Sequence, residues 1–302
     1  MSKSTLGFLI TAGVLIVASA VIFIVVMSLN GWNFKSLSTS SYKTSTYEIT
    51  EDFDGIVTTT RTADVAFLPS WDDKCTVVCY ERESVIHEVK VDGNKLVIDV
   101  KDNRRWYEYI DLSFEAPKIT VYLPTDMLTS LNVNGSTGNV EVADGFTFED
   151  ISISVSTGSI SVSDVKAGTI DCKTSTGGIK IKRVTCSGNI YANVGTGKLT
   201  INDTQCNGIY SEGRTGDVKL TDTIATDAFG IQRSTGDIEL ERCDAESITI
   251  KTSTGDIEGT LLSAKAFFTH TSTGDIDVPR GTTGGTCTLT TTTGDIEIKV
   301  KK

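Results

Sequence analysis

The chain has 302 residues, of which 39% are hydrophobic and 22% are charged, so it can form one large core or two modest ones. Its net charge of -11 argues against nucleic acid as a partner, because phosphate binding needs clustered Lys and Arg side chains. Its 27 Gly and many Ser and Thr residues would suit disorder, but regularly spaced Val, Ile and Leu predict strands joined by tight turns instead.

Residues 6–29 form an uncharged apolar run that predicts one transmembrane helix. Such a helix is about 36 Å long, which exceeds the roughly 30 Å hydrocarbon core of a bilayer. The alternative is a signal peptide cleaved at the small residues 18–20. Cleavage there would leave an exposed apolar run beginning at Val21, so we favour an anchor, with residues 1–5 as a short cytoplasmic head.

Two segments without a repeat follow this run. Residues 30–46 are rich in Ser and Thr and predict a linker between membrane and domain. Residues 47–130 contain strands, such as 95–100 and 118–123, which we interpret as irregular β coils that cap the N-terminal end of the domain. Within them, residues 62–65 (Thr-Ala-Asp-Val) resemble a degenerate copy of the repeat that follows.

A Thr-Gly pair recurs at spacings of 19 or 20 residues within residues 131–302. Its glycines are Gly138, Gly158, Gly177, Gly197, Gly216, Gly236, Gly255, Gly274 and Gly294. The residues two and four after each Gly, and seven before it, are apolar except for Gly259. Apolar and polar residues alternate around them, which is typical of strands with one buried side. Units this short must stack to bury their apolar side, about 4.8 Å apart. We therefore predict an all-β, single-strand-stack β-solenoid of about 20-residue coils, preceded by one transmembrane helix.

The C-terminal end of this solenoid carries three lysines. Lys299, Lys301 and Lys302 are expected beside the last strand, where positive charge discourages edge-to-edge pairing. Together with the irregular N-terminal coils, they predict a solenoid capped at both ends.

The seven Cys residues do not resemble a disulfide framework, because their number is odd and they are spread over a long domain. We interpret them as buried thiols. The alternative that stays open is a bridge between Cys186 and Cys206, which occupy the same position on adjacent coils.

An acidic strip is predicted on the last coils, because Asp follows the turn Gly and a second carboxylate comes two residues later on the same side. The strip comprises Asp237, Glu239, Asp256, Glu258, Asp275, Asp277, Asp295 and Glu297. Like charges about 5 Å apart repel, so one hypothesis is that Ca²⁺ bridges carboxylates of neighbouring coils. The other is that each Asp accepts hydrogen bonds in its turn and that the strip is simply solvated. We expect no other cofactor.

Two further columns of equivalent residues stand out. Tyr191, Tyr210 and Phe268 share an outward position and could stack on sugars or on a partner protein, although scattered exposed aromatics are common. Thr residues three and one before the turn Gly continue the inward series, so we expect them to satisfy backbone groups at the corner rather than to bind a crystal surface.

No catalytic residues are predicted. Only His87 and His270 are available for acid–base chemistry, they lie far apart in sequence, and no zinc-protease or serine-hydrolase motif is present. The enzymatic alternative is a β-helix polysaccharide lyase or hydrolase that uses the acidic strip. We expect a protein that is not an enzyme.

The pattern resembles the bacterial putative-adhesin β-strand repeat family of unknown function, related to toast-rack-like envelope domains. The resemblance rests on Ile119-Thr120-Val121-Tyr122-Leu123-Pro124 leading to Leu131-Asn132-Val133, on the Gly-turn repeats and on the single N-terminal span. It covers residues 47–302 and implies association with the bacterial cell envelope, with no catalytic residues to carry over.

Two functions are therefore weighed. The first is a non-enzymatic, membrane-anchored module, crossing the bacterial cell membrane once, with its domain outside the cytoplasm and an envelope protein or cell-wall polymer as partner in adhesion or envelope sensing. The alternative is a structural scaffold whose solenoids assemble end to end at the membrane, which the two capped ends argue against.

Overall fold

The structure, a computed structural model, describes residues 3–32, 41–104, 116–125, 127–281 and 283–301. Helix α1 (Lys3–Leu29) carries no charge after its first residue, and its residues from Ser4 on are exposed except for Met27. By length and composition it can cross a membrane, and a signal sequence near the N-terminus would have the same properties.

Every other element is a strand. The first twelve are β1 (Tyr42–Ile49), β2 (Gly55–Thr60), β3 (Asp64–Pro69), β4 (Cys75–Arg82), β5 (Val85–Asp92), β6 (Lys95–Asp102), β7 (Lys118–Leu123), β8 (Met127–Thr137), β9 (Val140–Val142), β10 (Thr147–Thr157), β11 (Ile160–Ser163) and β12 (Lys166–Thr176). The others are β13 (Ile179–Lys182), β14 (Thr185–Cys186), β15 (Asn189–Thr196), β16 (Leu199–Thr215), β17 (Val218–Thr235), β18 (Ile238–Cys243), β19 (Ser247–Lys251), β20 (Ile257–Leu261), β21 (Lys265–His270), β22 (Ile276–Asp277), β23 (Gly285–Thr290) and β24 (Ile296–Val300).

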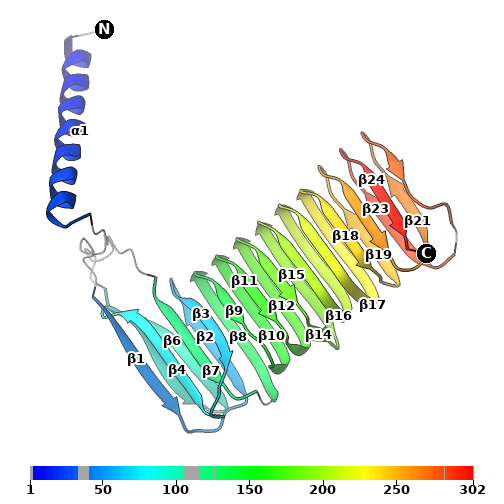
Figure 1. Cartoon of the computed structure of the whole chain (residues 1–302), viewed down its shortest axis with the longest axis horizontal. Helices are drawn as coiled ribbons and strands as arrows, with labels where there is room; N and C mark the ends of the chain where they lie inside the picture. The colour runs from blue at the N-terminus through cyan, green and yellow to red at the C-terminus, as the bar shows by residue number, and fades with distance from the viewer. Residues whose placement is uncertain (1–2, 33–40, 105–115, 126, 282, 302) are drawn as a thin grey trace.

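The strands confirm the predicted β-solenoid, which has about 8 turns (Figure 1). Strands that enter the Thr-Gly turns pair in parallel as face 1, in the order β6, β2, β8, β10, β12, β15, β16, β17, β19, β23 and β21. Strands that leave the turns form face 2, in the order β7, β3, β9, β11, β13, β16, β17, β18, β20, β24 and β22. The long strands β16 and β17 contribute to both faces.

The N-terminal end differs from the repeats because its outer strands are antiparallel. Strand β5 pairs with β6, β4 with β7, and β1 with β4. Strands β2 and β3 form a coil of the repeat type inside this cap, and their turn at residues 61–63 confirms the degenerate copy. The expected linker is shorter than predicted, since β1 begins at Tyr42, and residues 33–40 of it lie outside the described part of the chain.

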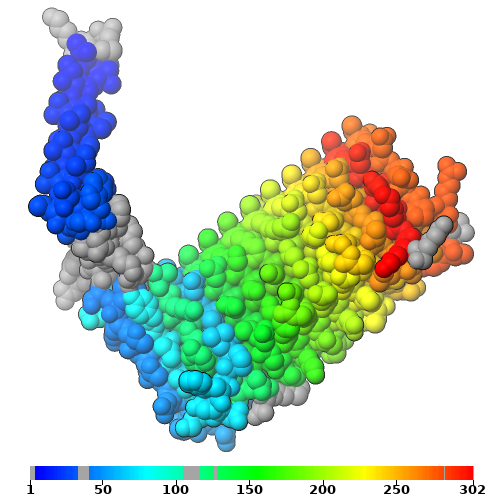
Figure 2. Space-filling model, viewed as in Figure 1, coloured from blue at the N-terminus to red at the C-terminus, as the bar shows by residue number. Residues whose placement is uncertain are grey.

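The coils at the C-terminal end do not stack in chain order. Strand β23 lies between β19 and β21, and β24 lies between β20 and β22, so the last coil of the sequence is the last but one in space. Figures 1 and 2 show orange β21 at the free end, with the red strands inside it. The expectation that lysines flank the free edge is therefore wrong for Lys299, which lies on the internal strand β24; Lys302 is outside the described residues.

The core explains this order. The predicted inward apolar positions are buried, except for Phe267, Ile276 and Val278 of the Gly274 coil, and Ile276 is 45% exposed. The Gly294 coil supplies a full set of buried residues, including Cys287 and Ile298. At one inward position, the Gly274 coil has the polar Thr269 and the Gly294 coil has the buried Leu289. Because burying apolar area stabilises the fold, this difference favours the Gly294 coil at the internal position.

The corners confirm that the Thr residues three before the Gly cap the backbone, but the expectation that those one before the Gly also face inward is wrong, since Thr157 and its equivalents are exposed. The hydroxyls of Thr174 and Thr252 donate to the carbonyl oxygens of Gly158 and Gly236 at 2.9 and 3.3 Å. Thr residues one before the Gly contribute their backbone groups, as where the Gly138 amide donates to the Thr157 carbonyl at 3.0 Å. These bonds satisfy backbone groups that would otherwise be left unpaired at a buried corner.

The cysteines are free and buried, as predicted for thiols. The alternative bridge between Cys186 and Cys206 is not formed, and the Cys186 thiol faces the Gly168 carbonyl oxygen at 3.2 Å. Burial, followed by the nearby Cys186, raises the pKa of Cys206 to about 12, so this thiol stays protonated at neutral pH.

Candidate binding surface

Two tyrosines form a stacked pair on the outside of face 1. Tyr191 of β15 and Tyr210 of β16 are direct partners in the parallel register. Their ring centroids lie 5.5 Å apart with 21° between the ring planes, and Tyr191 is 40% exposed. In a solenoid, equivalent residues on adjacent coils lie at the strand spacing, which suits offset stacking of aromatic rings. The pair presents a flat, continuous aromatic surface.

Two glycines make room for this pair. A Cβ atom at Gly208 or Gly230 would lie 2.9 Å from the Tyr210 ring, so neither position accommodates a side chain without moving the ring. The Asn189 side-chain amide donates to the Tyr191 hydroxyl at 3.3 Å and fixes its edge. The Tyr210 pKa is raised by burial and then by the Asp227 carboxylate, so its hydroxyl is a neutral hydrogen-bonding group.

A polar groove continues from the tyrosines toward the Thr-Gly turns. It has a volume of about 430 Å³ and lies across β12, β15, β16 and β17. Asn193 and Glu212 line it and follow the two tyrosines by two residues, so each lies on the same side of its strand as the tyrosine before it. Gly195 and Gly213 also line the groove. A Cβ atom would lie 2.5 Å from the Ser175 carbonyl oxygen at Gly195 and 2.3 Å from the Val194 carbonyl oxygen at Gly213, so neither position accommodates a side chain without moving the backbone.

Positive charge surrounds the groove of this acidic protein. Lys173 and Arg214 line it. Arg233 is 2% exposed and lies close to the backbone at Gly213, since a Cβ there would be 3.0 Å from its guanidinium carbon. Glu212 is the one acidic residue among those that line the groove. The groove therefore offers hydrogen-bonding groups beside a net positive charge.

Phe268, the third predicted aromatic, is not part of this surface. It lies on β21 at the free end, where its register partner is Thr288, and it is 61% exposed. The structure therefore brings together two of the three residues of the predicted partner surface.

The acidic strip forms a hydrogen-bonded ladder along the turns. The amide of Asp256 donates to Oδ1 of Asp237 at 3.0 Å, that of Asp295 to Asp256 at 2.8 Å, and that of Asp275 to Asp295 at 2.7 Å. The aspartates of this ladder follow the spatial order of the coils, so Asp295 lies between Asp256 and Asp275. These bonds give the aspartates a role in the turns that requires no metal.

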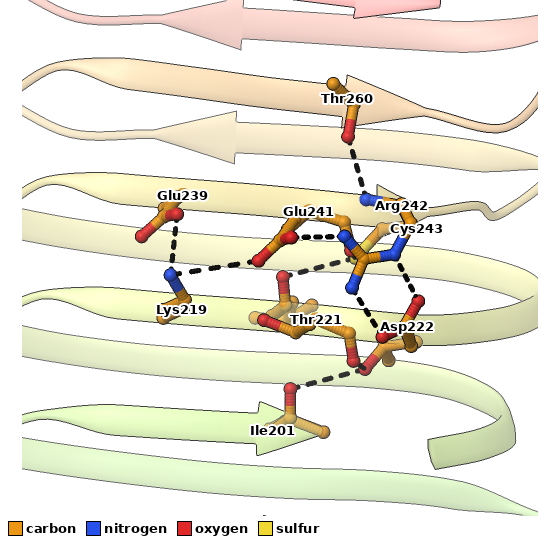
Figure 3. A network of polar contacts seen from close by, with 11 residues as sticks. Ile201, Lys219, Thr221, Asp222, Glu239, Glu241, Arg242, Cys243 and Thr260 are labelled. Carbon is orange, nitrogen blue, oxygen red and sulfur yellow. Dashed lines mark hydrogen bonds and ion pairs between the residues drawn. The ribbon is translucent and has the colours of Figure 1, made fainter. Parts of the chain in front are cut away.

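Basic side chains pair with Glu239 of the strip and with Glu241 and Asp222, which lie outside it. Lys219 lies between Glu239 and Glu241, at 2.7 and 3.9 Å, as Figure 3 shows. In the same network Arg242 binds Asp222 through two bonds of 2.6 Å, and its amide donates to Thr260 at 2.9 Å. Arg242 lowers the pKa of Asp222. Like-charge repulsion is thus relieved partly by ion pairs between coils.

Calcium binding by the strip stays a prediction. The eight carboxylates contribute no group of three potential ligands within 4.8 Å of one another among the described residues. If Ca²⁺ nevertheless bridges neighbouring coils, millimolar Ca²⁺ should raise the Tm, because a ligand of the native state stabilises it. Mg²⁺ at the same concentration is the control. A Tm that Ca²⁺ leaves unchanged would mean that the hydrogen-bonded ladder alone accounts for the aspartates of the strip.

The aromatic pair could be predicted from sequence and the groove could not. The column position of the tyrosines follows from the 19- or 20-residue period. The groove depends on Gly195 and Gly213, which lie outside the Thr-Gly turn positions and give no signal by themselves. Their significance comes from their diagonal placement on adjacent coils, since Gly213 pairs with Val194, the residue before Gly195.

The fold and this surface define a class of protein: a β-solenoid with one N-terminal apolar helix and a polar groove beside an exposed aromatic pair. The sequence model of the Toastrack DUF4097 family matches residues 53–187 and 184–302. The chain belongs to this family, and the predicted resemblance is confirmed.

Several solved structures are similar to this chain at low sequence identity. A putative adhesin from Parabacteroides merdae has 10% identity and a TM-score of 0.50 over 86% of this chain and 96% of its own. A putative adhesin from Bacteroides fragilis has 17% identity and a TM-score of 0.49 over 86% and 97%. A putative lipid binding protein from Parabacteroides distasonis has 16% identity and a TM-score of 0.45 over 87% and 98%. No curated protein matches the chain.

Proposed function

We propose that this chain is a non-enzymatic, membrane-anchored module of the bacterial cell envelope that binds a cell-wall polymer in adhesion or envelope sensing. The stacked pair Tyr191 and Tyr210 beside the glycine-lined groove carries the proposal. The solved structures named as adhesins support a binding role, and none of the three is named as an enzyme.

The chemistry of the surface favours a polysaccharide with acidic groups. Sugar rings present apolar C–H faces that pack against a flat aromatic surface, and their hydroxyls need the hydrogen-bonding groups that Asn193 and Glu212 supply. Lys173 and Arg214 would pair with carboxylates or phosphates on the polymer. Because successive coils repeat at the strand spacing, the face can follow an extended chain rather than enclose one small molecule.

Replacing Tyr191 and Tyr210 together with alanine should weaken binding to purified cell-wall polymer by about 30-fold or more, because buried aromatic anchors dominate such interfaces. Co-sedimentation of the full-length protein in detergent with cell walls measures the effect. Phe268→Ala is the matched control, since it removes an exposed aromatic from the same column at a distant coil. Equal binding by the double variant and the control would reject the proposed surface.

The proposal also places the solenoid outside the cytoplasm, with α1 as the anchor. The uncovered apolar helix supports membrane association. Protease added to intact cells should cleave the domain to the same extent as in lysed cells. Protection until lysis would place the solenoid inside the cell and contradict binding to the wall.

One observation favours the scaffold alternative. The free end at β21 and β22 exposes Ile276 and an unpaired strand edge, in place of the expected lysines. Such an edge can pair with another chain. If solenoids assemble end to end, the sedimentation coefficient should rise with concentration and Ile276→Lys should abolish the rise. A coefficient independent of concentration excludes the scaffold.

A further inference from the structure

Three potential metal ligands meet inside the N-terminal cap. Cys79 and Glu81 of β4 and His87 of β5 place one ligand atom each within 4.8 Å of the other two. All three residues are at least 97% buried, with exposed fractions of 0%, 1% and 3%. Cys79 and Glu81 are two residues apart, so both point to the same side of β4. The cluster lies in the cap, away from the tyrosine surface.

The charge of this cluster favours a divalent cation. Among the described residues, the ion-pair partner of the buried Glu81 is His87, whose Nδ1 lies 3.0 Å from Glu81 Oε2. A dication with one thiolate, one carboxylate and a neutral imidazole makes a group without net charge. Thiolate and imidazole ligands favour zinc over the hard cations Ca²⁺ and Mg²⁺.

Neighbouring side chains already hold the ligands as a zinc site requires. Ser45 of β1 donates to Glu81 Oε1 at 3.1 Å, and the His87 amide donates to Glu81 Oε2 at 2.6 Å. The other ring nitrogen of His87, Nε2, faces the Thr60 hydroxyl of β2 at 3.5 Å. A metal-bound imidazole usually bonds its second nitrogen in this manner. Ligands of one zinc lie about 3.3–3.8 Å apart, so only small shifts are needed.

A cavity of about 230 Å³ lies beside His87. Thr60 and His87 line it together with Arg61, Arg82 and Arg104, whereas Cys79 and Glu81 do not. His87 is therefore the ligand that lies nearest to this cavity.

We propose that Cys79, Glu81 and His87 form a zinc site that joins β4 and β5 and, through Ser45 and Thr60, fixes β1 and β2 beside them. Three protein ligands leave the fourth position of a tetrahedral zinc to a water molecule. Bound zinc would stabilise the antiparallel cap by joining β4 to β5.

Cobalt is a direct probe of this site. The tag-free full-length protein in detergent, freed of metal by a chelator, should take up one Co²⁺ per chain and develop a near-ultraviolet thiolate-to-cobalt band. One equivalent of Zn²⁺ should then abolish the band and raise the Tm. Cys75→Ser is the matched control, because Cys75 is also buried on β4 but lies outside the cluster, and it should keep the band.

Two variants locate the site. Cys79→Ser should lose the band, while Ser45→Ala keeps all three ligands and should weaken Co²⁺ affinity about 10- to 100-fold. If Cys79→Ser does not fold, Ser45→Ala and the wild-type spectrum still decide. Absence of the thiolate band in the wild type, or its persistence in folded Cys79→Ser, overturns the proposal.

Discussion

Gly197→Ala should lower the free energy of unfolding by about 3 kcal/mol or more, because the turn glycines support one another. Gly197 has φ of 143°, a backbone conformation that residues with a side chain rarely adopt. A Cβ atom there would also lie 2.0 Å from the carbonyl oxygen of Gly177 on the preceding coil. Backbone atoms of a stacked coil cannot move aside singly, so the change must separate neighbouring coils.

Urea unfolding of the full-length protein, followed by circular dichroism, measures this cost. Gly93→Ala separates the two contributions, since Gly93 has φ of 64° with no atom within 4 Å of the position of its Cβ. It should lose only about 1–2 kcal/mol, the cost of a left-handed conformation. Similar losses for both variants would show that close stacking of the turns is unimportant.

Arg233→Met should raise the free energy of unfolding by about 1–3 kcal/mol, the reverse of the usual effect of a core substitution. The Arg233 guanidinium donates to the Ser211 hydroxyl at 2.9 Å and the Gln232 carbonyl at 2.8 Å, while its Nε has no partner. No ion pair is recorded for it within the described part of the chain. Burial lowers its pKa to about 10, so it stays charged at neutral pH.

The pH dependence has a definite sign. Because the folded pKa lies below the ordinary value of 12.5, the unfolded state holds more protons between these two values, and stability rises with pH only above about 10. The gain in the free energy of unfolding from Arg233→Met should therefore be constant from about pH 6 to pH 9. Arg214→Met, an exposed neighbour, should change stability by less than about 0.5 kcal/mol. A variant less stable than the wild type would show that the packing of this side chain outweighs its charge.

The location of Arg233 connects stability with the proposed function. Arg233 occupies the position of Thr174 and Thr252 in other coils, three residues before the turn Gly, where a hydroxyl would cap the turn. Its charge instead adds to that of Lys173 and Arg214 at the groove. An anionic polymer would benefit from this charge, so the stabilised variant should bind such a polymer more weakly.

The sequence by itself determined the solenoid. The period, the apolar positions around each Gly and the inward Thr column follow from the alternation of side chains along a strand, which is local physical chemistry. The outward column of Tyr191 and Tyr210 follows from the same alternation. The two rings are in contact because coils that are consecutive in sequence also stack directly on each other in the middle of the solenoid.

The tertiary structure alone decided the order of the coils at the C-terminal end. It alone also decided which residues meet in the groove and in the cluster of the cap. Every coil presents the same apolar rows, so the period cannot tell whether the Gly274 or the Gly294 coil lies outermost. The inward Leu289 of the Gly294 coil, which pairs with Thr269 of the Gly274 coil, favours the internal position for the Gly294 coil. The groove required glycines on adjacent coils, and the cluster of Cys79, Glu81 and His87 required β4 and β5 to be held together in the antiparallel cap. Such contacts join residues that no regular spacing relates.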